Sequence, residues 1–249
     1  MARKDWLDLT QPERTALVNA LFKLKAKTDS SRNYDFFVRQ HVNFFSSFQA
    51  HRAASFFPWH REMLRRFEIE LGVELPYWNW GRDRQGSVTT SATTGIFARD
   101  FLGHPDFLNA QRWRCVEAFD LGEQLRRGWF GQLPTATQVA NTMAAPTFTQ
   151  FTTTVERAPF HNNVHGIIGG QDGTGHMGDG SSPNDPVFFL HHCFVDKLWS
   201  DWQAKHPSQT TQDGQYWPLG RGTSRDLGID AVMQPWGVSV RSTLTFRPY

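Results

Sequence analysis

The chain has 249 residues, with 26 Lys and Arg, 24 Asp and Glu, and a formal net charge of +2 at pH 7. This balance gives no electrostatic argument for nucleic acid or an anionic membrane as a partner, and no apolar run is long enough to cross a bilayer. The unusual totals are 10 His, 10 Trp and 21 Phe. An aromatic core with many histidines is a reason to look for a metal site.

The N-terminus and the cysteines bear on cellular location. The first residues, 1–6, lack the apolar core of a signal peptide. The cytoplasm is therefore the default location, with export alongside another protein as the alternative. Cys115 and Cys193 cannot build a disulfide framework. The two cysteines could form one disulfide bond with each other, whereas a reducing compartment favours two free thiols.

The N-terminal third of the chain predicts three helices. Residues 10–13 have the pattern of a capping box with an early proline, and apolar residues then repeat at helical spacing. A second helix is predicted over about 34–48 and a third over about 58–71. His41 and His60 lie on the apolar stripes of these two helices, where an imidazole is costly unless its nitrogens are used.

The rest of the chain alternates loops and helices. Residues 86–95 predict a surface loop, and the Thr-rich stretch 135–154 predicts irregular structure. A short helix over 160–168 precedes a glycine-rich loop at 169–180. Asp185 and Pro186 are then typical of an N-cap and a first-turn proline.

The helix that follows Pro186 is predicted to reach about Trp202. The chain from His206 onward predicts irregular structure, with a strand near 238–246. Because there is no internal repeat and no clear linker, the sequence predicts one mainly helical domain over 1–249, without a C-terminal lid domain.

Seven of the ten histidines fall into two clusters. The first holds His41, His51 and His60; the second holds His161, His165 and the pair His191 and His192. Two of them, His161 and His165, are four residues apart, so a helix places both on one face. Pro58 argues against one helix through 51–60, so His51 is placed before the third helix and His60 in its first turn. Helical periodicity does not indicate whether His191 or His192 would be the metal ligand.

A single buried histidine is more often a hydrogen-bonded core residue than a metal ligand, and one His-x3-His pair is weak on its own. Three histidines per cluster, each on a predicted inward face, favour a metal site. All-imidazole sites suit copper, zinc, iron or nickel. The spacing does not separate zinc from copper, and the His-Glu-x-x-His protease motif is absent.

Several segments that contain or flank the clustered histidines have a recognisable pattern. They are 51–61 and 75–80 for the first cluster, and 161–165, 182–192 and 196–199 for the second. These segments resemble the first and second copper motifs of the tyrosinase family of type 3 dinuclear copper proteins. Residues 10–41 resemble the start of short bacterial tyrosinases, so the resemblance spans roughly 10–206.

The resemblance implies a mainly α fold, a four-helix bundle with long irregular loops that holds two copper ions in its middle. The ligands would be His41, His51 and His60 for one ion, and His161, His165 and His192 for the other. His191 would then lie beside the site, packing or hydrogen-bonding. Proteins of this family bind dioxygen as a peroxide bridging both coppers, hydroxylate monophenols at the ortho position and release o-quinones. The predicted activity is thus that of a tyrosinase acting on small phenolic substrates.

The resemblance also implies roles for side chains near the ligands. A Glu before the first histidine of the second site and an Asn after it hold a water that deprotonates monophenols. Asn162 matches directly, and Glu156 lies five residues upstream of His161. The alternative for Glu156 is a solvated carboxylate at a helix start, paired with Arg157. Asp196, one turn after His192, could orient a ligand imidazole or form a surface ion pair with Lys197 or another neighbour.

Three positions depart from, or vary within, the family pattern. Gln49 replaces the Cys that some members cross-link to the second histidine of the first site, so no thioether is expected. Gly166 follows His165 and adds no side chain at the pocket mouth, which would admit bulky substrates. Cys193 follows His192 and is expected to be packed rather than reactive.

Several alternatives remain open from the sequence. A catechol oxidase or an o-aminophenol oxidase would use the same six histidines. Haemocyanin oxygen carriers share the copper pair, although they are larger multidomain chains, and a two-zinc hydrolase would bind another metal. Some bacterial members use a small helper protein to load copper, and nothing in this sequence decides whether one is needed.

Overall fold

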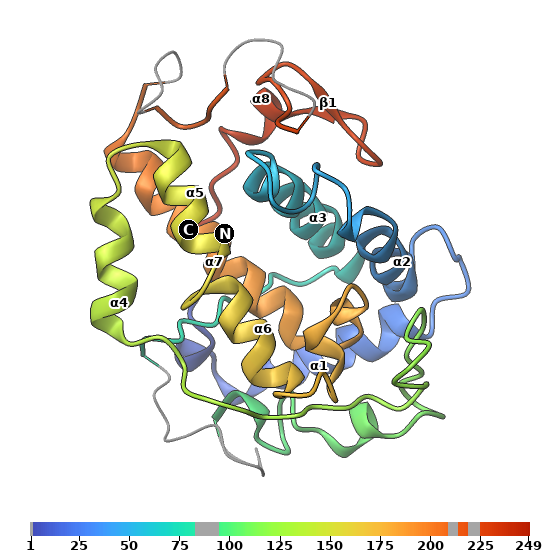
Figure 1. Cartoon of the computed structure of the whole chain (residues 1–249). Helices are drawn as coiled ribbons and strands as arrows, with labels where there is room; N and C mark the ends of the chain where they lie inside the picture. The colour runs from blue at the N-terminus through green and yellow to red at the C-terminus, as the bar shows by residue number, and fades with distance from the viewer. Residues whose placement is uncertain (1, 83–94, 209–213, 219–224) are drawn as a thin grey trace.

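The computed structural model describes residues 2–82, 95–208, 214–218 and 225–249. Its longer helices are α1 (Gln11–Lys25), α2 (Tyr34–Phe45), α3 (Phe56–Leu71), α5 (Phe148–Glu156), α6 (His161–Gly169) and α7 (Val187–Lys205) (Figure 1). The shorter elements are η1 (Trp6–Asp8), η2 (Gly95–Phe97), η3 (Pro105–Leu108), α4 (Ala136–Asn141), η4 (Thr142–Ala144), η5 (His176–Gly178), η6 (Ser182–Asn184) and α8 (Val240–Thr243). The strands β1 (Val232–Met233) and β2 (Val238–Ser239) pair antiparallel.

The predicted helix starts are confirmed with small shifts. The Thr10 hydroxyl accepts the Glu13 N–H and the Glu13 carboxylate accepts the Thr10 N–H, so α1 begins with the predicted capping box. Helix α2 ends at Phe45, three residues before the predicted end. Helix α3 begins at Phe56, two residues before Pro58, because a proline within the first turn removes no hydrogen bond that the helix needs.

The second half of the chain brings two corrections. The stretch 135–154 is not irregular, because it forms α4 and most of α5. Thr135 and Thr147 cap these helices through their hydroxyls, which offsets the low helix propensity of threonine. Phe151 also stacks on Trp202 of α7 at 5.0 Å between ring centroids, so tertiary packing overrides the local preference.

Smaller corrections concern α7, the C-terminal region and one loop. The N-cap of α7 is Pro186, although the Asp185 carboxylate accepts the Val187 N–H at 3.1 Å. The strand predicted over 238–246 is limited to Val238–Ser239, because the Ser239 side chain then caps the short helix α8. The surface loop predicted over 86–95 lies outside the described residues, apart from Gly95.

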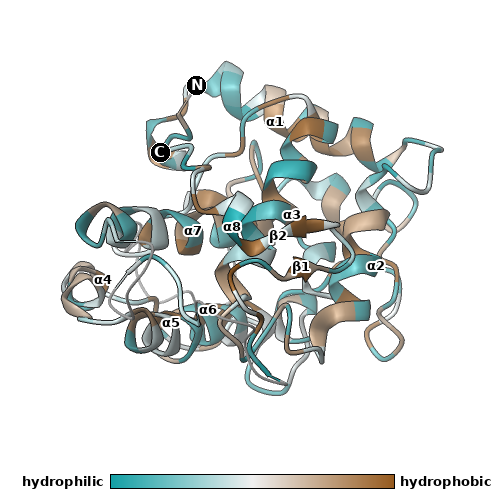
Figure 2. Cartoon of the chain, turned by 90° about the horizontal axis from the view of Figure 1, so that it is seen from above, coloured by the Kyte–Doolittle hydropathy of each residue, from teal (hydrophilic) through white to brown (hydrophobic). Residues whose placement is uncertain are grey.

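Four helices surround the histidine clusters. Helix α7 contacts α3 and α6, and α2 contacts α3, so α7 runs through the middle of the molecule (Figure 1). The hydropathy colouring shows hydrophobic and hydrophilic residues on the same helices, as expected for helices with one buried face (Figure 2). The predicted mainly helical bundle is confirmed.

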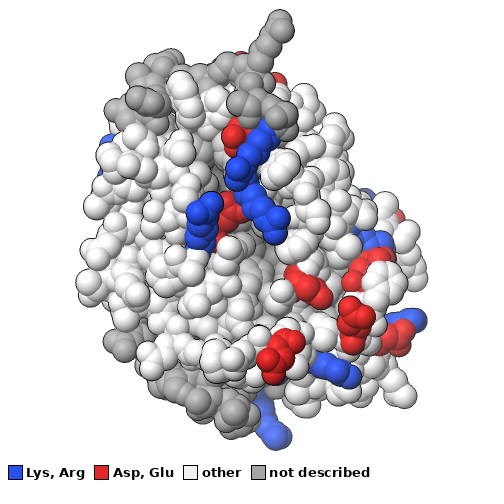
Figure 3. Space-filling model, viewed as in Figure 1, with Lys and Arg blue, Asp and Glu red and all other residues white. Residues whose placement is uncertain are grey.

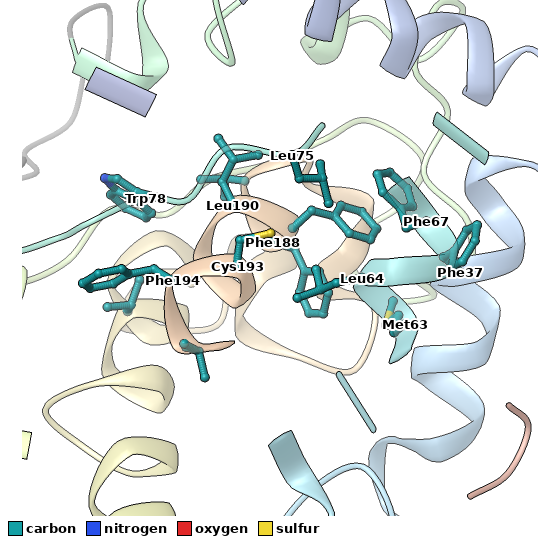
Figure 4. Packing of buried hydrophobic residues seen from close by; sticks show 14 of the residues in the cluster. Phe37, Met63, Leu64, Phe67, Leu75, Trp78, Phe188, Leu190, Cys193 and Phe194 are labelled. Atoms are coloured by element: carbon teal, nitrogen blue, oxygen red, sulfur yellow. The ribbon is translucent and has the colours of Figure 1, made fainter. Parts of the chain in front are cut away.

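The interface between α3 and α7 contains an apolar core. Met63, Leu64 and Phe67 of α3 lie across from Phe188 and Cys193 of α7, and all are buried (Figure 4). Phe67 also stacks on Phe189, with ring centroids 3.5 Å apart. Buried apolar area of this kind stabilises the helix pair by roughly 25 cal/mol per Å² and fixes its spacing. The histidines that the two helices carry are thereby held at fixed positions.

The two ends of the described chain lie together. The Arg3 N–H donates to the Pro248 carbonyl at 2.6 Å, and the termini are close in Figure 1. In the described ranges, no helix has both the length and the apolar character needed to span a membrane.

Candidate metal centre

The first histidine cluster is contributed by α2, α3 and the loop between them. His41, His51 and His60 have potential ligand atoms within 4.8 Å of one another, and all three are buried. The Nδ1–H of His41 donates to the Gly180 carbonyl at 2.7 Å, and that of His60 to the Phe56 carbonyl at 2.9 Å. The Nε2 atoms of His41 and His60 are buried without a hydrogen-bond partner.

The second cluster is contributed by α6 and α7. The Nε2 atom of His192 lies 3.3 Å from that of His161 and 3.2 Å from that of His165. The Nδ1–H groups of the latter two are engaged: His161 donates to the Asn162 Oδ1 at 2.9 Å and His165 to the Met177 carbonyl at 2.8 Å. Their Nε2 atoms are therefore unprotonated and carry lone pairs, and both atoms lie beside the Nε2 of His192.

This arrangement of lone pairs fits a bound cation. Two nitrogens bound to one ion at about 2.0 Å, with a tetrahedral angle between them, lie about 3.3 Å apart, which matches both separations. Converging lone pairs repel one another in a dry pocket unless a positive charge lies between them. The donor set thus fits a metal ion that prefers imidazole, and copper is such an ion.

The two clusters face each other across a short distance. The rings of His60 and His192 stack with centroids 4.3 Å apart, which joins the first cluster to the second. Phe188 contacts His41 and His192 at centroid distances of 5.0 and 4.1 Å. The Phe188 side chain therefore packs against both clusters and excludes water from that side of them.

One loop orients ligands of both clusters. The carbonyl of Gly180 holds His41, and the carbonyl of Met177 holds His165. These hydrogen bonds fix the tautomer and the ring orientation of a ligand imidazole, as carbonyl partners do in metal sites. The glycine-rich loop predicted at 169–180 is thus part of the site. The sequence did not indicate this role, because backbone acceptors leave no side-chain signal.

Burial keeps the ligand imidazoles neutral. Desolvation lowers the pKa of His41 to about 3 and that of His165 to about 4, and lowers the pKa values of the other four to well below their usual range. Neighbouring imidazoles oppose protonation further. A neutral imidazole is the form that binds a metal, so the site is prepared for metal over a wide pH range.

His191 lies in the second cluster but at its edge. Its ligand atoms fall within the same 4.8 Å group, while its ring packs on Trp80 and on the face of His161, at 5.1 and 5.3 Å between centroids. The short nitrogen separations belong to His192 instead. The geometry thus favours His192 as the ligand and His191 as its packing neighbour.

A cavity of about 280 Å³ opens onto both clusters. Glu156, Asn162 and Gly166 all line it, so the structure brings together the three pocket residues that the sequence indicated. A Cβ atom added to Gly166 would meet nothing within 4 Å. The absence of a side chain at this position therefore leaves open space at the mouth of the cavity.

Glu156 is not the solvated, ion-paired carboxylate of the alternative interpretation. It ends α5 rather than starting a helix, is 9% exposed and accepts a hydrogen bond from the Arg52 N–H. Burial raises the pKa of Glu156 to about 7, although that hydrogen bond and the charges of Arg157, Arg225 and Arg52 act in the opposite direction.

Asp196 forms an ion pair with a neighbour, as the second interpretation allowed, but the pair is buried and its partner is Arg61 rather than Lys197. Its carboxylate accepts hydrogen bonds from the Arg61 Nε–H at 2.6 Å and the Tyr249 hydroxyl at 2.8 Å, while the Nδ1 of His192 is buried without a partner. Lys197 pairs instead with Asp201. Although Asp196 lies one turn after His192 on α7, its carboxylate pairs with Arg61 of α3, where a buried arginine needs a counter-charge.

The last predictions from the sequence concern the two cysteines and Gln49. Cys115 and Cys193 are both free and buried. Burial raises the pKa of the Cys115 thiol to about 12 and raises that of Cys193, so both are packed rather than reactive. The Gln49 side chain accepts the Gln234 N–H at 2.7 Å, at the position where some relatives carry the cross-linked Cys.

Comparisons with known proteins agree with this geometry. The family model of the common central domain of tyrosinase matches residues 31–123 and 121–205. Tyrosinase from Streptomyces antibioticus is 33% identical over 280 residues, which covers 97% of this chain and 95% of that protein. Tyrosinase from Streptomyces lincolnensis is also 33% identical, over 94% of this chain and 92% of that protein.

Solved structures show the same fold. Polyphenol oxidase from Thermothelomyces thermophila has a TM-score of 0.71 at 20% identity, covering 99% of this chain and 86% of that one. A functional unit from octopus hemocyanin has a TM-score of 0.61 at 24% identity, covering 82% of this chain and 53% of that one. The family match, the Streptomyces relatives and the paired histidine clusters together show that the chain belongs to the tyrosinase family and is a copper oxidoreductase of that family.

Proposed function

We propose that the protein uses dioxygen as a co-substrate to hydroxylate monophenols at the ortho position and to oxidise catechols to o-quinones. Two copper ions would be bound, one by His41, His51 and His60 and the other by His161, His165 and His192. The observation that carries this proposal is that the Nε2 atom of His192 lies 3.2–3.3 Å from those of His161 and His165, while the His192 ring stacks on His60 of the other cluster.

Copper bound at these histidines would supply dioxygen binding and the electron transfer of the oxidation. The protein holds the imidazoles in place through the carbonyls of Phe56, Met177 and Gly180. Phe188 keeps the floor of the site apolar. The phenol ring would enter through the cavity of about 280 Å³, which accepts one aromatic ring with a substituent.

Glu156 and Asn162 would handle the phenolic proton. A base works best when its pKa is close to the working pH, and burial raises the pKa of Glu156 to about 7. Asn162 lines the same cavity and accepts a hydrogen bond from His161 through its side-chain oxygen. We assign Glu156 as the acceptor of the proton, through a water held with Asn162, and this step is needed for monophenols more than for catechols.

The first experiment is oxygen uptake by copper-loaded protein given 4-methylphenol, with 4-methylcatechol in a parallel reaction. Uptake with both substrates, and quinone colour from the monophenol, is the expected result. Uptake with the catechol alone would reduce the proposal to a catechol or aminophenol oxidase. Bound copper with reversible oxygen binding and no turnover would identify an oxygen carrier instead.

Variants of the two proton-handling residues test the assignment. Glu156→Gln and Asn162→Ala are expected to lower kcat/KM for the monophenol by about a hundredfold, the size of a general-base contribution, with a much smaller loss for the catechol. Asn163→Ala is the matched control, since Asn163 is the same residue type one position along α6 and lines neither this cavity nor the larger one beside it. Equal losses on both substrates would remove the proton role.

A further inference from the structure

A second, larger cavity adjoins the cavity at the histidine clusters. The outer cavity has a volume of about 540 Å³ and shares Arg52, Glu156 and Asn162 with the inner cavity. The shared residues form the boundary between the two spaces. For a phenol whose hydroxyl points toward the histidines, the substituent on the opposite side of the ring would extend past these shared residues toward the outer cavity.

The outer cavity is rich in positive charge. Arg52, Arg157 and Arg225 line it, together with the acidic residues Glu156 and Asp226. In the view of Figure 3, basic side chains gather around a hollow between α5 and the start of α3, with acidic atoms among them. Among the described residues that line it, the three guanidinium groups outnumber the two carboxyl groups, so these side chains together carry a net positive charge.

The two carboxyl groups are already hydrogen-bonded to the backbone. The Asp226 carboxylate accepts the Ala54 N–H at 2.8 Å, and that of Glu156 accepts the Arg52 N–H. Arg225 donates from Nε to the Arg52 carbonyl at 2.7 Å. Within 2–82, 95–208, 214–218 and 225–249, the guanidinium groups of Arg52 and Arg157 have neither an ion pair nor a hydrogen bond.

We propose that the outer cavity recognises an anionic substituent, so that the preferred substrates are phenols with a carboxylate on the side chain para to the hydroxyl. Arg52 and Arg157 are the binding residues, because their guanidinium groups present parallel N–H donors suited to a carboxylate. An ammonium group at the same place would be repelled by these arginines, and a neutral ester would gain no charge-assisted hydrogen bond. This inference rests on the proposed phenol oxidation and adds the substrate class to it.

The contact between the carboxylate and the arginines lies away from the reacting ring, so it should affect KM and kcat differently. An interaction of equal strength in the ground state and the transition state lowers KM and leaves kcat unchanged. The preference should also weaken as salt screens the partly solvated arginines. A merely structural role of the arginines would produce neither the split between KM and kcat nor the salt dependence.

The test compares catechols that differ only at the end of the side chain, which removes any dependence on the hydroxylation step. The substrates are 3-(3,4-dihydroxyphenyl)propionate, its methyl ester and 3-(3,4-dihydroxyphenyl)propylamine. We expect the carboxylate to have a KM about tenfold lower than that of the ester, the effect of one charge-assisted hydrogen bond. The amine should have the highest KM, and kcat should be similar for the carboxylate and the ester.

Arginine variants assign the effect to the cavity. Arg157→Gln and Arg52→Gln should each reduce the preference for the carboxylate, and the double variant should abolish it while oxidation of the ester persists. Arg99→Gln is the control, because Arg99 is exposed and lines neither cavity. An unchanged preference in the double variant, or no preference in the unmodified protein, would overturn the proposal.

The design separates this inference from the proposed function. Oxidation of the ester without a preference for the carboxylate would reject the anion site and leave phenol oxidation intact. If no catechol is oxidised, phenol oxidation fails. Calorimetric binding of benzoate against benzamide then decides the anion site, since benzoate binding that is lost in the double variant supports it and equal affinities reject it.

Discussion

Arg61 donates from Nε to the Asp196 carboxylate at 2.6 Å, and this buried ion pair joins α3 to α7. Each helix carries a histidine beside it, since His60 precedes Arg61 and His192 lies one turn before Asp196. The guanidinium also lies over the Trp199 ring, 3.8 Å from its centroid. The pair therefore fixes the spacing between two helices that supply ligands to different clusters.

Asp196→Asn is expected to destabilise the fold by about 3–5 kcal/mol, because removing one partner leaves the buried Arg61 charge uncompensated. The measurement is urea unfolding of the copper-free protein. Asp201→Asn is the control on the same helix: its ion pair with Lys197 is partly exposed, and its loss should cost less than about 0.5 kcal/mol. Similar losses in the two variants would show that the Arg61 pair has no special structural role.

Metal content distinguishes the two adjacent histidines of α7. His192→Ala should lower the bound copper from two ions toward one per chain, because its Nε2 lies at the convergence point with His161 and His165. His191→Ala should retain both ions and lower stability by a few kcal/mol through the cavity it leaves beside Trp80. Elemental analysis after dialysis provides the count. Loss of copper from His191→Ala and retention in His192→Ala would reverse the assignment.

We predict that Gly166 sets the width of the cavity mouth, and size variants test this role. Gly166→Ala should be tolerated and stabilise α6 by about 0.5–1 kcal/mol, since a Cβ atom there meets nothing within 4 Å. Gly166→Phe should raise KM for 4-tert-butylcatechol severalfold more than for catechol itself. If both substrates respond equally to the phenylalanine, Gly166 does not set the width of the mouth.

His176 links acid pH to the stability of the loop that orients His41 and His165. Its Nδ1 accepts the Arg126 N–H at 3.0 Å, and its Nε2 contacts the Gly122 carbonyl at 3.3 Å. Burial lowers the pKa of His176 from its ordinary value of 6.5. Because the folded pKa is the lower one, the unfolded chain takes up the proton first as the pH falls. The stabilisation is therefore fully present above about pH 6.5 and is lost as the pH falls toward the folded pKa.

The matched variant is His176→Gln, which keeps one donor and one acceptor but does not titrate. The free energy of unfolding, measured between about pH 7.5 and about pH 5.5, should fall more steeply for the unmodified protein than for the variant. Parallel curves would mean that His176 has the same pKa in the folded and unfolded chains.

The sequence by itself determined the helices that carry ligands and the division of the histidines into two clusters. Helical periodicity and capping are local properties, so the starts of α1, α3 and α6 could be predicted to within two residues. The same local rules failed for 135–154, where threonine caps and packing of Phe151 on Trp202 outweigh low helix propensity.

Tertiary structure alone decided how these parts meet. The burial of Glu156, the pairing of Asp196 with Arg61 and the three arginines at the outer cavity all join residues far apart along the chain. The carbonyls of Met177 and Gly180 that orient ligand imidazoles leave no mark in the residue types. Local sequence patterns report periodicity and caps, whereas desolvation and charge pairing depend on which surfaces the folded chain brings together.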